Sequence, residues 1–147
     1  NLMARVLIKK LNPDVELPIY KTSGASGMDL MAFLEEPIRI APNRSYLVPT
    51  GLSMAFSEDY EIQIRPRSGL AAKNNITVLN TPGTIDSDYR GEIKIILFNH
   101  GKIDFIINNK DRVAQMILTP IVKMELEETD NLPDSLRGEG GFGSTGK

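Results

Sequence analysis

The chain has 147 residues, a formal net charge of −2 and a sequence pI of about 5.5, so it lacks the basic field that binding to a nucleic acid polymer requires. It contains no cysteine, which excludes disulfides, zinc–thiolate sites and cysteine nucleophiles, and its one histidine makes a multi-histidine metal site hard to build. We find no apolar run of membrane-spanning length and no signal-peptide pattern, so we expect one soluble, cytoplasmic domain.

Short apolar stretches separated by Pro, Gly, Asn and Asp predict a mainly β protein with about ten strands, a spacing typical of sandwiches and barrels. In chain order the expected strands are 6–8, 28–34, 37–40, 45–48, 52–56, 60–65, 77–79, 92–98, 105–107 and 113–126. One short helix is expected at 69–73, with Ser68 as its N-cap. Pro120 interrupts the last run and should lie at a sheet edge or a bend.

After residue 126 the sequence becomes acidic and then rich in glycine, which predicts an extended C-terminal arm. We therefore divide the chain into a core with its arm, residues 1–136, and a flexible tail, residues 137–147. An arm that leaves a small β domain often packs on a neighbouring copy.

The tail combines an aromatic ring with groups that suit phosphate oxygens. Phe142 could stack on a base, while Arg137, Ser144 and Thr145 supply a guanidinium and two hydroxyls. This pattern is typical of a flap that closes over a nucleotide, and its alternative is a disordered terminus, which its glycines favour.

The end of the tail, residues 141–147, also matches the start of the P-loop pattern G-x-x-x-x-G-K. A P-loop needs a strand before it and a helix after it, so that the helix N-terminus meets the phosphate. Pro133 and Asp134 precede the segment and no helix follows Lys147 in this sequence. We therefore reject the P-loop interpretation.

The stretch RPRSGL, residues 65–70, places a strand end before a helix start. Helix-start amides, together with Arg67 and Ser68, could bind an anion. The alternative is a plain N-cap beside a surface arginine.

The stretch 80–91 lies between two apolar strands and predicts a hairpin. Its main chain could read a small planar ligand, with an amide from Asn80 and a carboxylate from Asp86 that could serve as a general base. The alternative is that its Asn, Pro, Gly and Asp residues only form turns.

Two further polar segments precede apolar strands. Asp29 enters the second expected strand after a loop of small residues, and Arg112 and Gln115 open the last one. Their alternatives are a structural aspartate in a turn and the opening of a hairpin.

Together, in this order and spacing, these segments resemble the homotrimeric dUTP pyrophosphatases (dUTPases) along nearly the whole chain. The matching motifs are ASGMDL (25–30), PRSGLA (66–71), GTIDSDYRGE (83–92), DRVAQMI (111–117) and RGEGGFGSTG (137–146). The resemblance implies a distorted jelly-roll or β-clip barrel that assembles as a trimer, with each active site built from three subunits. It also implies hydrolysis of dUTP to dUMP and pyrophosphate with Mg²⁺, which limits uracil in DNA and supplies dUMP for thymidylate synthesis.

The resemblance also implies roles for individual residues. Asp86 is similar to the general base that activates water, Tyr89 to the tyrosine that packs on the deoxyribose, and Asp29 to the aspartate that orients the metal's water shell. The residues implied to bind substrate are Arg67, Ser68, Gly69 and Gln115 for the phosphates, Asn80 and the main chain near Lys94 for uracil, and Arg137, Phe142, Gly143, Ser144 and Thr145 in the tail.

The sequence departs from the family pattern at two positions. Lys110 replaces the glycine that usually precedes Asp-Arg in the fourth motif, and Thr84 replaces a branched aliphatic residue. Two alternative functions remain open. One is a catalytically weak relative that binds dUTP for regulation. The other is dCTP deaminase, which shares the fold but needs a glutamate where this sequence has Ile96.

Overall fold

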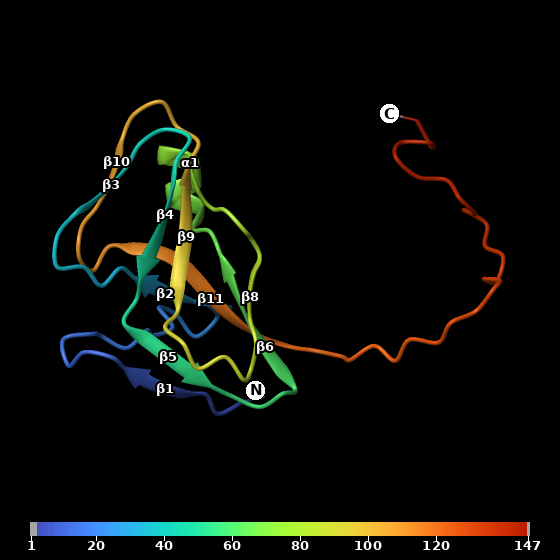
Figure 1. Ribbon diagram of the computed structural model, residues 1–147, viewed down its shortest axis with the longest axis horizontal. Coiled ribbons are helices and arrows are strands. Elements are labelled where there is room, and N and C mark those ends of the chain that lie inside the picture. Colours follow the sequence, from blue (N-terminus) through green and yellow to red (C-terminus); the bar gives the residue numbers. More distant parts are fainter. Residues whose placement is uncertain (1–2, 147) are drawn as a thin grey trace.

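The computed structural model describes residues 3–146, which form a mainly β body and a long C-terminal arm (Figure 1). The mainly β prediction with one short helix is confirmed. The helix is α1 (Ser68–Asn74). The strands are β1 (Leu7–Lys10), β2 (Met28–Met31), β3 (Ile38–Ile40), β4 (Ser45–Pro49), β5 (Leu52–Ala55), β6 (Tyr60–Arg65), β7 (Ile76–Val78), β8 (Gly83–Ile85), β9 (Lys94–Asn99), β10 (Phe105–Ile107) and β11 (Arg112–Pro120).

The strands pair in antiparallel fashion in four small sheets. The largest has the order β2-β11-β6-β8, the next has the order β4-β9-β7, and two-stranded sheets join β1 to β5 and β3 to β10. Within residues 3–146 these sheets form no closed barrel, and the arrangement is jelly-roll-like.

The core lies between these sheets because the apolar residues alternate along the strands. In β9, Ile95 and Leu97 are fully buried, whereas Lys94 is exposed. Leu30 of β2 and Ile107 of β10 are fully buried in the same apolar cluster. This period of two is the expected pattern for strands with one face on a core.

The prediction that Ser68 caps the helix is wrong. Arg67 is the N-cap, with extended backbone at φ −88° and ψ 131°, and Ser68 is the first helical residue. No side chain caps this end, because a guanidinium has no acceptor for the helix-start N–H groups. The Arg67 guanidinium instead contacts Asp29 and the carbonyl oxygen of Arg112.

The prediction of one strand over 113–126 is also wrong, because β11 ends at Pro120. Pairing with β2 stops at Met116, so Pro120 has a neighbouring strand on one side only, as its missing N–H requires. One more main-chain bond follows, from Ile121 N–H to Asp59 O, and the arm then runs free of strand pairing.

The expected hairpin at 80–91 is more elaborate than predicted. β7 pairs directly with β9, but the connection between them contains β8, which pairs with β6 in the largest sheet. The connection therefore bridges two sheets, and this bridging fixes the position of Asp86 at the end of β8.

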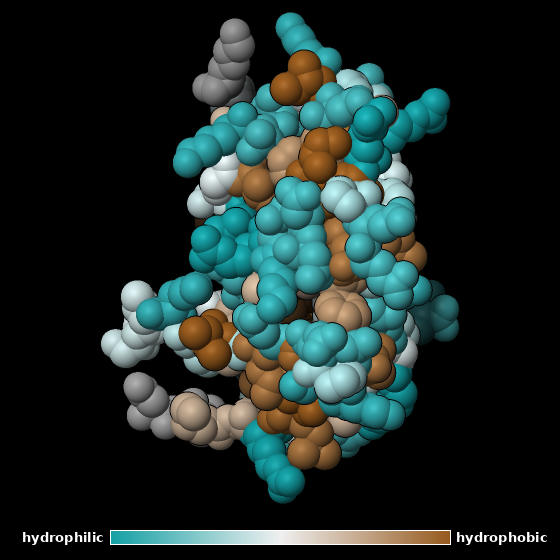
Figure 2. Space-filling model, turned by 90° about the vertical axis from the view of Figure 1, so that its left-hand side faces the viewer, coloured by the Kyte–Doolittle hydropathy of each residue, from teal (hydrophilic) through white to brown (hydrophobic). Residues whose placement is uncertain are grey.

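The arm extends far from the body, as the orange to red trace in Figure 1 shows. Its large apolar side chains are exposed along its length: Val122, Met124, Leu126, Leu132 and Leu136. The body presents a largely hydrophilic face with apolar groups gathered mainly toward one end (Figure 2). In the described part of the chain, no helix has the length and apolar character needed to cross a membrane.

Candidate active site

A pocket of about 300 Å³ lies where β8 ends and β9 begins. Asp86, Tyr89 and Lys94 line it together with apolar side chains that include Leu47 and Ile96. Pairing of β8 with β6 holds Ile85 in place, so Asp86 leaves the sheet directly at the pocket with an exposed side chain. The arrangement puts a carboxylate and an aromatic ring at one partly apolar cavity.

Tyr89 is fixed by its own loop. Its N–H donates to Asp86 O at 3.1 Å, and its hydroxyl donates to Glu92 O at 2.9 Å. A Cβ added at Gly91 would lie 2.3 Å from the Tyr89 hydroxyl oxygen, so only glycine lets the ring fold back in this way. Gly91 is thus a supporting residue that the sequence analysis gave no role.

A second cluster forms where β2, β11 and α1 meet. Asp29 forms two ion pairs, with Arg67 Nε at 3.3 Å and with Arg112 Nη1 at 3.5 Å. Arg67 also donates from Nη1 to Arg112 O at 3.1 Å. Both arginines line a pocket of about 280 Å³ together with Lys110 and Asp111, so a phosphate group there would meet three cations and one carboxylate. Arg112 was not among the predicted site residues, although its place beside Gln115 in the fourth motif could have indicated it.

Gln115 joins this cluster through the sheet. It is paired with Asp29 on one side and with Arg65 on the other, and its side-chain amide donates to Pro66 O at 3.0 Å. That bond ties β11 to the start of α1, where Ser68 and Gly69 are exposed. The structure therefore brings Gln115 and Arg67, which were predicted to bind phosphate, close to Asp29, which was predicted to orient the metal's water shell.

Asn80 lies apart from the Asp86 pocket. Its exposed side chain packs against Gly83 at the start of β8 and does not line that pocket. It shares the β7–β9 connection with Asp86, but within one chain the two side chains do not share a cavity.

The C-terminal tail, residues 137–146, lines neither the Asp86 pocket nor the Arg67 pocket of its own chain. Arg137 donates from Nε to Gly140 O at 2.7 Å, and Phe142 is fully exposed. Gly143, Ser144 and Thr145 are also exposed, and Ser144 N–H donates to Gly141 O at 3.0 Å within the tail. Lys147 lies outside the described residues. Within one chain, the tail that was predicted to close over a nucleotide therefore covers neither pocket.

The donor set fits a magnesium ion that is held mainly by its substrate. Residues 3–146 contain no group of three or more His, Cys, Asp or Glu side chains that could hold a metal ion. Both Asp29 oxygens already contact arginines, yet each keeps lone pairs for water, so this carboxylate suits a metal's water shell better than direct ligation.

Comparison with known proteins agrees with this geometry. A family model described as dUTPase matches residues 14–146. The chain belongs to the dUTPase family. Within this family it is 52% identical to the deoxyuridine 5′-triphosphate nucleotidohydrolase of Nautilia profundicola over 97% of this chain and 99% of that protein. It is 53% identical to the protein of the same name from Chlamydia pneumoniae, over 93% of this chain and 95% of that protein.

Solved dUTPases share the fold. A Staphylococcus bacteriophage 80alpha dUTPase variant with dUpNHpp superposes with a TM-score of 0.88 at 22% identity, covering 97% of this chain and 99% of the phage chain. A dUTPase from phage phi11 of S. aureus, described as coordinating a structural Mg(II) ion, gives a TM-score of 0.78 at 20% identity, covering 88% and 99%. At these identities the likeness to the solved dUTPases shows the fold alone.

Proposed function

We propose that this dUTPase hydrolyses dUTP to dUMP and pyrophosphate by attack of an Asp86-activated water on the α-phosphate. Family membership supplies the enzyme class, dUTP diphosphatase, and the reaction of the relatives. The observation that carries the mechanism is the exposed Asp86 carboxylate beside Tyr89 in one pocket. The physiological outcome is less uracil in DNA and a supply of dUMP for thymidylate synthesis.

Asp86 is suited to the role of general base by its position. It follows β8 directly and its carboxylate is exposed at the pocket, so it can accept a proton from water. The water oxygen bonds to the α-phosphorus, the bond to the pyrophosphate oxygen breaks, and the proton moves to Asp86. The products are dUMP and pyrophosphate.

The sugar binds in the Asp86 pocket and uracil binds next to it. Tyr89 packs on the deoxyribose and leaves no space for a 2′-hydroxyl, while Asn80 and the main chain near Lys94 contact uracil. The fixed ring of Tyr89 supports this assignment, because a group that is already held in place loses little freedom on binding. Because Asn80 lies at the start of β8, uracil would extend from the pocket along β8 toward Gly83.

The phosphates are bound by the second cluster. Arg67, Ser68, Gly69 and Gln115 contact them, with Arg67 held in place by Asp29. Mg²⁺, bound chiefly by triphosphate oxygens and oriented through water by Asp29, would neutralise the charge that grows on the departing pyrophosphate. Pre-positioned cations aimed at this charge are expected to supply much of the acceleration.

The active unit is a homotrimer whose subunits share sites. Val122, Met124 and Leu126 alternate along the exposed arm, and an apolar stripe of this kind needs a partner surface. Arg137, Phe142, Gly143, Ser144 and Thr145 then close over the nucleotide bound by another subunit. The end of the chain lies far from the body of its own subunit, which supports this arrangement (Figure 1).

The test is nucleotide turnover by the full chain. Pyrophosphate release is measured with dUTP, dCTP, dTTP and UTP, with and without Mg²⁺. We expect Mg²⁺-dependent release from dUTP only. Ammonia release from dCTP would instead indicate deamination, which the apolar Ile96 in the Asp86 pocket argues against. Tight dUTP binding without turnover would indicate a regulatory relative and would overturn the proposal.

A further inference from the structure

Lys110 occupies a backbone conformation that is unusual for a lysine. It has φ 70° in the four-residue turn 108–111 that joins β10 to β11. Asp111 N–H donates to Asn108 O at 3.1 Å across the turn, so Lys110 is its third residue. Turns with a positive φ at this position favour glycine, because a Cβ is strained there. Some other interaction must hold the turn in this form.

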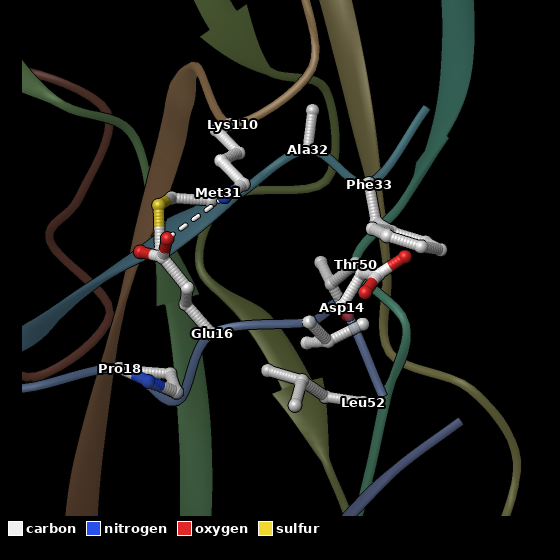
Figure 3. A pocket seen from close by; sticks show the side chains of 10 residues that line it. Asp14, Glu16, Pro18, Met31, Ala32, Phe33, Thr50, Leu52 and Lys110 are labelled. Atoms are coloured by element: carbon white, nitrogen blue, oxygen red, sulfur yellow. Dashed lines mark hydrogen bonds and ion pairs between the residues drawn. The ribbon is translucent and has the colours of Figure 1, made fainter. Parts of the chain in front are cut away.

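Asp111 Oδ2 accepts from Asn108 N–H at 2.8 Å within the turn, and an ion pair of the Lys110 side chain adds a second contact. Lys110 Nζ lies 2.9 Å from Glu16 Oε1, and Glu16 belongs to the long connection between β1 and β2. Figure 3 shows the two side chains pointing toward each other beside Met31. The hydrogen bond from Lys110, reinforced by its charge, lowers the pKa of Glu16, and the same contact raises the pKa of Lys110.

The turn is connected directly to the phosphate cluster. Lys110 N–H donates to Ala32 O at 2.8 Å, and Ala32 N–H donates to Asp111 O at 2.8 Å, which fastens the turn to the end of β2. The next residue after the turn is Arg112, whose carbonyl oxygen accepts from Arg67 and whose guanidinium contacts Asp29. A shift of the turn would therefore move the groups that orient Arg67.

We propose that Glu16 and Lys110 form a brace that positions Arg67 for the substrate phosphates. The inference rests on the proposed function of Arg67 as a phosphate ligand. Glu16 acts only through Lys110. Lys110 lines the same pocket as Arg67 and Arg112, but its ammonium is held by Glu16, so it acts by fixing the turn. The lysine is a departure from the glycine typical of the family, and the brace compensates for the conformational freedom that is lost with it.

The proposal can be tested by substituting Glu16 and Lys110 separately and measuring KM and kcat for dUTP. Glu16→Gln and Lys110→Met should each raise KM for dUTP by about three- to tenfold with kcat nearly unchanged. The double variant should have a KM no higher than that of either single variant. Lys110→Arg, which keeps the charge, and Lys110→Gly, which adopts the turn without help, should stay within about twofold of the wild type. The matched control is Arg39→Met, which removes another exposed ion pair, to Asp104 at 3.5 Å, and should leave KM unchanged.

Binding measurements distinguish a brace from a direct phosphate ligand. Affinity for a non-hydrolysable dUTP analogue, measured by calorimetry, should fall in Glu16→Gln as KM rises, whereas inhibition by deoxyuridine, which lacks phosphate, should not change. If Lys110→Met weakens binding but Glu16→Gln does not, Lys110 contacts the phosphates directly and the brace is wrong. Unchanged KM in both single variants overturns it as well. A wild-type chain without dUTP turnover would refute the proposed function, while the analogue would still test the brace.

Discussion

Asp86 and Asp88 stand two residues apart in the same exposed loop, yet only Asp86 lines the pocket beside Tyr89. The difference arises because Asp86 is the first residue after β8, and the turn closed by Tyr89 N–H and Asp86 O directs the chain back toward the pocket. Two carboxylates of equal chemistry are thereby given different surroundings, and this difference can be tested directly.

If Asp86 activates water, Asp86→Asn should keep nucleotide affinity within about tenfold and lower turnover by at least roughly 10²-fold, because the amide cannot accept the proton. Asp88→Asn, which changes the same charge in the same loop, should turn over dUTP at nearly the wild-type rate. Single-turnover kinetics with dUTP measures the affinity and the rate of hydrolysis for each variant. A nearly active Asp86→Asn enzyme would contradict the assignment.

The sugar preference should depend on the position of the Tyr89 ring. Tyr89→Ala should narrow the dUTP/UTP ratio of kcat/KM values by roughly tenfold, because it opens space for the 2′-hydroxyl. Gly91→Ala should act in the same direction, since its methyl would displace the ring. Tyr89→Phe keeps the ring and loses only the bond to Glu92 O, so its ratio should change least. An unchanged ratio in Tyr89→Ala would show that another group reads the sugar.

At the scale of elements, the strands are joined by polar contacts at their ends as well as by the core. Asn99, the last residue of β9, is buried and donates to Ile40 O at 2.9 Å and to Ile103 O at 2.8 Å. It also accepts from Gly101 N–H at 2.8 Å. One amide thus connects β9 to β3 and to the loop that leads into β10.

Removing that amide should destabilise the protein. Asn99→Ala leaves two carbonyls and one N–H without partners, so we expect a loss of about 3 kcal/mol. Urea unfolding at a fixed protein concentration should show a lower midpoint with an unchanged slope. Asn74→Ala, at the exposed end of α1, is the control and should shift the midpoint little. An equal shift in both variants would argue against this role for Asn99.

The link between the β1–β2 connection and the 108–111 turn should depend on pH. The pKa of Glu16 is lowered in the folded state, so its contribution to stability is present above the ordinary value of 4.5 and is lost as pH falls through the lowered value. The pKa of Lys110 is raised, so its contribution is present below 10.5 and is lost as pH rises through the raised value.

The stability difference between the wild type and Glu16→Gln should therefore be steady near neutral pH and shrink toward both extremes. Urea midpoints measured across the pH range would check this. The difference should also be smaller in high salt, because both side chains are about half exposed and the pair is screened. A difference that grows below pH 4 would contradict the assignment.

At the scale of the whole molecule, the C-terminal arm has the composition of a segment that needs a partner. Its apolar side chains are exposed, and in the described residues its tail forms hydrogen bonds only within itself and to Ser135 of the adjoining arm. Ordering such a tail costs about 1–2 kcal/mol per residue, which a nucleotide could offset through stacking on Phe142 and charge-assisted bonds to Arg137.

Deleting residues 137–147 should leave a folded trimer but lower dUTP turnover severely, because water exclusion and phosphate clamping depend on the tail. Light scattering should give about three times the chain mass of 16.3 kDa for both the intact and the truncated protein. A truncated enzyme with full activity, or an active intact protein with the mass of one chain, would contradict the shared-site arrangement.

Much of the fold could be predicted from local patterns. The alternation in residues 60–65 specifies a strand with one buried face, and it is visible without any knowledge of partners. The motifs around Asp29, Arg67, Asp86 and Gln115 likewise predict candidate site residues, because their order and spacing are properties of the sequence alone.

Other features depended on partners that are distant in the sequence. The end of β11 at Pro120, the pairing of β8 with β6 and the two arginines around Asp29 follow from which strands lie side by side. The sequence by itself determined most of the strands, the motifs and the family resemblance. The tertiary structure decided how the motifs meet, since hydrogen bonds and ion pairs act over a few ångströms of space, whatever the separation along the chain.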